Sequence, residues 1–138
     1  MNTGGVTFKT GIVSATKVGF AKVKFEELDG METQWLVVNY TKTHQDKCVW
    51  TLDVGEHVNC IMDEHLEDGC ILGAAYSDAE PPPVSSPDKF HMRFKDGGLF
   101  EYDRASGDMT IVAKGEINIK ATGNINLNGA FIHLNEGG

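Results

Sequence analysis

The segments GDMTIVAK (107–114), GEINIKAT (115–122) and GNINLNGA (123–130) decide the fold of the second half of this chain. Each eight-residue unit, called an octad below, opens with glycine, which permits a turn into the next unit. Apolar side chains alternate with polar ones inside every octad, as in a β-strand with one buried face. The alternating pairs are Met109 and Ile111, Ile117 and Ile119, and Ile125 and Leu127.

Strands of this kind have one apolar face and open edges, so a single copy favours association. A single-chain solenoid needs roughly 18 residues per coil to turn around three sides, whereas an octad makes one side. Three chains wound together would complete each layer and close it by threefold symmetry. The alternative, a meander of hairpins, is disfavoured because Gly115 and Gly123 are lone glycines without two-residue hairpin loops. The sequence therefore predicts a trimeric β-helix.

The prediction places this β-helix at residues 90–138, after a linker at 79–89 that contains all four prolines. About six short strands between Phe90 and Asn135, at ~4.8 Å spacing, would give a prism about 25–30 Å long. The first half, residues 1–78, reads as five short strands and predicts a small barrel. Asp29-Gly30 gives its hairpin signal, ahead of a strand at 33–39. The only helix is expected between Thr41 and Asp53, so the fold class is all-β.

Composition narrows the functional classes. The 138 residues, with 41% hydrophobic and 23% charged, fit one compact domain with an appendage. The N-terminus has no secretory pattern, so we expect assembly in a cytoplasm. Cys48, Cys60 and Cys70 are predicted to be reduced core thiols, because their odd number and spacing fit no disulfide framework. A net charge of −8 per chain argues against nucleic acid as a partner.

Several segments together resemble the baseplate assembly protein V family, the central spikes of contractile phage tails, which are related to type VI secretion spikes. They are KTGIVS (9–14), WLVV (35–38), GEHV (55–58), GCILGAAYS (69–77), FEYD (100–103) and the octads with NLNGAFIHLN (126–135). The resemblance implies an oligonucleotide/oligosaccharide-binding (OB) barrel at residues 6–78, contacting the tail hub, and an intertwined triple-stranded β-helix that pierces the target envelope. It also implies a homotrimer in the virion baseplate, without enzymatic activity. The acidic run DEHLED (63–68) argues against nucleic-acid binding by this barrel.

No catalytic, cofactor or metal residue is predicted. Many relatives carry a His-x-His tip that binds iron. Here the positions two residues before and after His133 are Phe131 and Asn135, so the second histidine is absent. A one-residue slip near Gly129-Ala130 would turn His133 outward, and without that slip three copies of it could meet a metal.

The sequence also gives little support for a zinc site or for a glycosidase site. His44 with Cys48, and Cys60 with His65 and Cys70, lack the tight pairs of zinc modules. The segment between Tyr76 and Phe90 is too short to hold a glycosidase domain of the kind some relatives carry.

Two hypotheses concern partners. Because three residues follow Asn135, we expect a separate tip protein to contact residues 131–138, with Ile132 and Leu134 as the last buried rung and Glu136 reaching a basic base. In the barrel, Trp35, Leu36 or Val37 should join the core, and Trp50 should lie near the rim toward the hub. Alternatives left open are a type VI or tailocin spike carrying a tip protein or effector, and a glycan- or polyanion-binding module.

Overall fold

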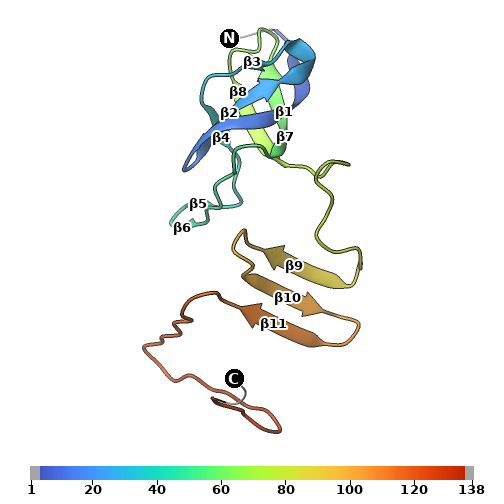
Figure 1. Cartoon of the computed structure of the whole chain (residues 1–138). Helices are drawn as coiled ribbons and strands as arrows, with labels where there is room; N and C mark the ends of the chain where they lie inside the picture. Colours follow the sequence, from blue (N-terminus) through green and yellow to red (C-terminus); the bar gives the residue numbers. More distant parts are fainter. Residues whose placement is uncertain (1–3, 136–138) are drawn as a thin grey trace. The chain divides into compact units, whose positions relative to one another are not determined.

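The computed structural model describes residues 4–135, which divide into two compact units between Pro82 and Pro83 (Figure 1). That division lies inside the proline-rich segment 79–89. Each unit is described separately below. Within the described residues, no helix combines the length and hydropathy that a membrane span requires.

The first unit is a closed five-stranded barrel with the order β1-β7-β8-β4-β2, in which β2 pairs back to β1. Only the β4–β8 pair is parallel, and this strand order is that of an OB-like barrel. The short strand β3 extends the sheet beyond β2. The bounds are β1 (Val6–Lys17), β2 (Phe20–Phe25), β3 (Met31–Glu32), β4 (Leu36–Val38), β7 (His57–Asp63) and β8 (Gly69–Ala74). The predicted all-β barrel of five strands is confirmed.

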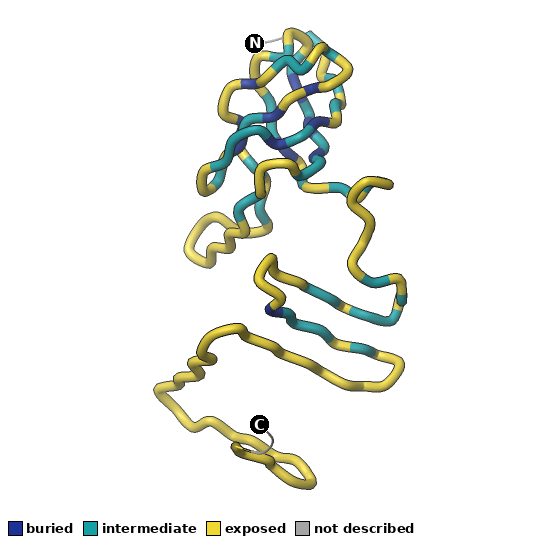
Figure 2. The backbone as a smooth tube through the Cα atoms, viewed as in Figure 1, coloured by how far each residue is buried: buried dark blue, intermediate teal, exposed yellow. Residues whose placement is uncertain are grey.

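Strand β1 closes the barrel because it pairs with β7 along its first half and with β2 along its second. A register shift between Val13 and Ala15 bends it between these partners. Gly11 lets β1 approach β2 closely, since a Cβ there would lie 2.7 Å from the carbonyl oxygen of Lys24. All five strands contribute buried residues to the centre of this unit, and the buried positions are dark blue in Figure 2. The buried core consists of Val13, Ala21, Val23, Phe25, Leu36, Val58, Cys60, Met62 and Ile71.

Asp29-Gly30, the predicted hairpin dipeptide, forms a turn after a short 3-10 helix, η1 (Glu26–Leu28). Asp29 has φ 57° and Gly30 has φ 73°. The strand expected at 33–39 is shorter, because Thr33 is buried and its hydroxyl accepts a 3.0 Å hydrogen bond from the amide of Val23. Strand β4 therefore begins only at Leu36. Leu36 is buried, as expected for this segment, while the side chains of Trp35 and Val37 are exposed.

The helix expected between Thr41 and Asp53 is wrong. This stretch forms a small hairpin of β5 (Thr43–His44) and β6 (Asp46–Lys47), with Gln45 left-handed at φ 59°. Residues 41–50 are all exposed, and they offer no apolar stripe at helical spacing that could pack on the barrel. Cys48 lies here and is exposed, so its assignment to the core was also wrong.

The second unit contains an antiparallel sheet of three strands in the order β9-β10-β11. The strands are β9 (Lys89–Arg93), β10 (Leu99–Asp103) and β11 (Asp108–Val112). Glycines with positive φ, Gly97 at 94° and Gly107 at 80°, stand in the two turns. The first octad thus pairs with β10 of its own chain, as the meander alternative requires. Residues 113–135 contain no strand, so the described part of this unit has three of the six expected segments and no β-helix.

Candidate functional site

The sheet of the second unit has one apolar face and one polar face. Phe100 pairs with Met92 on one side and Ile111 on the other, and Tyr102 pairs likewise with Phe90 and Met109. Residues paired across antiparallel strands point to the same face. Phe90 and Phe100 make an edge-to-face contact with ring centroids 6.2 Å apart. Six apolar side chains therefore share one face of a sheet only three strands wide.

Among residues 4–135, most of this apolar face is uncovered, although Met92 and Phe100 are half-buried. Phe90 and Met109 are each 59% exposed and Ile111 is 56% exposed. Full burial of one such side chain contributes about 1.5–3 kcal/mol. An uncovered apolar face of this extent is typical of a surface that another molecule covers.

The octads extend this exposed surface beyond the sheet. Bends occur at residues 114–115, 122–123 and 130, at a spacing of eight residues, and the residues between them have no regular secondary structure. All residues from 104 to 135 are exposed (Figure 2). Ile119 is 72% exposed and Leu127 is 68% exposed. These bends therefore recur with the same eight-residue period as the glycines in the sequence.

Apolar side chains two residues apart occur once in each strand or extended stretch of this unit. Sequence reasoning found the pairs of the octads but did not connect them with those of β9 and β10, although the spacing is the same. The pairs are Phe90 and Met92, Phe100 and Tyr102, Met109 and Ile111, Ile117 and Ile119, Ile125 and Leu127, and Ile132 and Leu134. We call these twelve side chains the apolar stripe.

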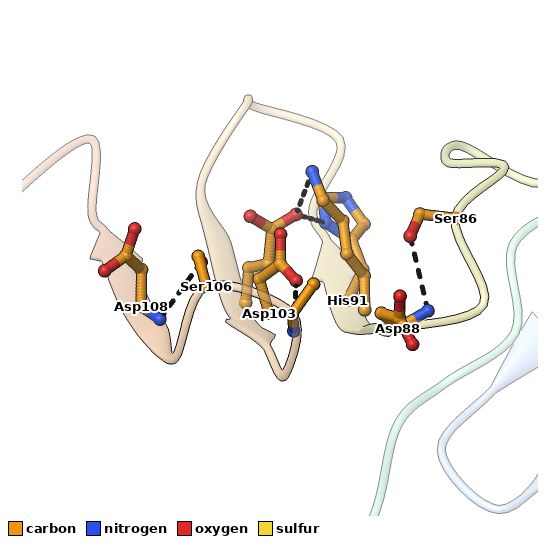
Figure 3. A network of polar contacts seen from close by, with 9 residues as sticks. Ser86, Asp88, His91, Asp103, Ser106 and Asp108 are labelled. Carbon is orange, nitrogen blue, oxygen red and sulfur yellow. Dashed lines mark hydrogen bonds and ion pairs between the residues drawn. The ribbon is translucent and has the colours of Figure 1, made fainter.

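The polar face of the sheet holds a histidine–carboxylate pair that sequence reasoning missed (Figure 3). His91 lies opposite Glu101, with Nδ1 2.9 Å from Oε1, and the ammonium of Lys89 lies 3.4 Å from the same oxygen. The hydrogen bond from His91, joined by the charge of Lys89, lowers the pKa of Glu101 below its ordinary value. Only the register of β9 against β10 brings these residues together.

This pair lacks the third member of a nucleophilic triad. The Nε2 atom of His91 is buried, and among the described residues it has no hydrogen-bond partner. A general base needs its nucleophile within hydrogen-bonding distance of that nitrogen. We therefore assign the pair to holding β9 and β10 in register, alongside turn-forming bonds such as Asp103 Oδ1 with the amide of Ala105 at 2.9 Å (Figure 3).

The candidate metal residues are not brought together. Cys60 is buried on β7 between Val58 and Met62, as its alternating position predicts, and burial raises its pKa to about 11. His133 is exposed, and its ring centroid lies 6.4 Å from that of Phe131. Across residues 4–135, the structure contains no group of three or more His, Cys, Asp or Glu side chains placed to hold a metal ion.

Comparisons with known proteins place these features in context. No family model matches the chain. The chain is 27% identical over 118 residues to the "Spike protein" of Escherichia phage P2. The match covers 85% of this chain and 56% of that protein, so the chain spans about half the length of its curated relative. The resemblance to phage baseplate spikes drawn from the sequence is thus confirmed at the level of a homologous phage spike protein.

Proposed function

We propose that this chain is the central spike subunit in the baseplate of a contractile injection machine, most simply a phage tail. The observation that carries the proposal is the apolar stripe, which is repeated through the second unit and of which all but Met92 and Phe100 are exposed in a single chain. The similarity to the spike protein of phage P2 supports it independently. The role is structural rather than enzymatic.

The working form is a homotrimer in which residues 90–138 make an intertwined triple-stranded β-helix. Bends eight residues apart support this form, because an eight-residue side spans one face of a three-sided prism. Three copies would turn their apolar stripes toward a common axis and remove them from water. In that arrangement Ile119 and Leu127, exposed in one chain, become core residues.

The mechanical function follows from strands that lie across the spike axis. Axial load compresses a continuous stack of hydrogen-bonded strands around an apolar core, and local opening must break contacts in three chains together. Sheath contraction would drive this rigid prism through the target envelope. Piercing therefore needs no catalytic residue.

The barrel, residues 1–78, would anchor the spike to the hub of the baseplate, with the segment 79–89 as a tether. Its exposed apolar side chains support a docking role, among them Trp50 at 55% exposure. The subunit would assemble in the host cytoplasm and reside in the tail of the virion. Contact with the envelope would be transient.

A separate tip protein would cover the distal end of the prism. Ile132 and Leu134, the last described pair of the apolar stripe, are 53% and 76% exposed and would form the terminal rung. A small cone-shaped protein could supply hydrogen-bond partners and apolar cover there. Glu136, expected to reach a basic base on this partner, lies outside the described residues.

The experiment that tests this function is the localisation of the chain in purified particles. A density map of the intact baseplate should show three copies on the tail axis, with the second unit pointing away from the tube. Density of another chain beyond the distal end would support the tip protein. Absence of the chain from particles that are otherwise complete would contradict the spike function.

A further inference from the structure

Two lysines and two aromatic rings form a surface feature on the outside of the barrel. Ala21 and Val23 of β2 face the core, so their neighbours Phe20 and Lys22 face outward. The ammonium of Lys17 lies 4.4 Å from the ring centroid of Trp35 and 5.1 Å from that of Phe20. The ammonium of Lys22 lies 5.3 Å from the same Trp35 ring. We call Lys17, Phe20, Lys22 and Trp35 the lysine–aromatic patch.

The patch has positive charge without a compensating carboxylate. Among the described residues, no ion pair within 4.0 Å involves Lys17 or Lys22, although the whole chain carries a net charge of −8. Two ammonium groups near one ring repel each other, and a carboxylate between them would relieve that repulsion. Phe20 and Trp35 remain 38% and 36% exposed as whole residues. The patch therefore suits an acidic partner that also brings apolar contact.

The turn between β7 and β8 offers such a group. Asp63 Oδ1 accepts hydrogen bonds from the amides of His65 and Glu67 at 3.1 and 2.9 Å, so this carboxylate is used within the turn. Glu67 is exposed and has no ion pair among the described contacts. The carboxylate of Glu64 lies against Gly4 and 3.4 Å from the imidazole of His65, so it already has neighbours within this unit. Glu67 is thus the carboxylate most available to a partner. We call residues 63–68 the acidic turn.

The patch and the acidic turn occupy different parts of one barrel. Strand β2, which carries Phe20 and Lys22, pairs with β1, β3 and β4 but not with β7 or β8, the strands that the turn joins. A ring with threefold symmetry needs two different complementary surfaces on every copy. The barrel provides such a pair, opposite in charge.

We propose that, in the homotrimer proposed above, the lysine–aromatic patch of each barrel binds the acidic turn of the next copy. The inference rests on that homotrimer, because the second units would hold three barrels together on short tethers. A tether at 79–89 can reach at most about 34 Å at ~3.1 Å per residue, which keeps the barrels at a high effective concentration. At this effective concentration, even a weak charged contact between two barrels would be formed most of the time.

Site-directed cross-linking tests this contact with every charge left in place. In a full-length Cys48→Ser background, Val18→Cys lies next to Lys17, and His65→Cys lies within the acidic turn. Both native side chains are well exposed, at 70% and 71%. A short bismaleimide should join these two positions between copies and give a covalent three-chain species on a denaturing gel. Each single variant should remain single-chained.

Charge exchange separates a specific contact from chance proximity. Adding Lys22→Glu should lower the cross-linking yield about tenfold, and adding Glu67→Lys as well should restore it. Lys24→Glu, on the same outward side of β2 but without an aromatic contact among those described, is the matched control and should leave the yield unchanged.

Light scattering of each variant measures its oligomeric state independently of the cross-linking yield. If the protein is a trimer but does not cross-link, or if Lys22→Glu does not change the cross-linking yield, the proposed contact is wrong and the proposed trimer is unaffected. A monomer overturns both.

Discussion

Replacing Ile119 by alanine tests whether the apolar stripe is a core or a surface. In a single chain Ile119 is 72% exposed, so the substitution would change stability by no more than about 0.5 kcal/mol. In the proposed trimer the same side chain lies in a closed core, where truncation costs about 2–5 kcal/mol per chain and so about 6–15 kcal/mol per trimer. Compared per chain, the two accounts differ by at least about fourfold in the free energy lost.

The assay is sedimentation of the purified chain over a dilution series, combined with denaturant unfolding. We expect Ile119→Ala to shift dissociation to much higher protein concentration, and Ile119→Asp to abolish the trimer because it would bury three carboxylates. Asn118→Ala is the matched control, since its side chain alternates to the opposite face and should be nearly neutral. Equal behaviour of the Ile119→Ala and Asn118→Ala variants would refute the reasoning.

Three further predictions concern positions outside the octads. Gly11→Ala should destabilise the barrel by about 1–3 kcal/mol in urea, because its methyl group would collide with β2; unchanged stability would contradict the packing described. Alkylation near pH 8 should modify exposed Cys48 quickly and Cys60, with its pKa raised to about 11 and its thiol buried, only on unfolding; equal rates would contradict that burial. The hydrogen bond from His91 lowers the pKa of Glu101, so the stabilisation by the ionised Glu101 carboxylate is complete above the ordinary glutamate pKa and is lost as the pH falls through the lowered pKa. The stability of the Glu101→Gln variant should therefore not show this loss at acid pH. A stability–pH profile identical to that of the unmodified protein would contradict a role of Glu101 ionisation in stability.

The barrel was predictable because its information is local. Alternation in β2 and the Asp29-Gly30 turn fix strands within a few residues, and a core formed by one chain then closes on itself. Prediction failed where tertiary contacts override the pattern. The pairing of Thr33 with Val23 interrupts a strand, and the exposed hairpin around Cys48 has no packing to favour a helix.

The candidate site could be predicted only in part, for a different reason. The octad glycines and their apolar pairs are visible in the sequence, but their burial partners would belong to other copies of the chain. The His91–Glu101 pair and the lysine–aromatic patch depend on strand register and on ring contacts, which spacing in the sequence does not encode. The apolar pairs of β9 and β10 could have been found by their shared i, i+2 spacing.

The most direct test of the central claim is the mass of the purified full-length chain in solution. Light scattering coupled to size-exclusion chromatography, at micromolar concentration and moderate salt, should give three times the chain mass of 15.1 kDa. The mass should hold on dilution, because the proposed core involves all three chains. A stable species of 15.1 kDa would contradict the account, since the apolar stripe would then remain in water.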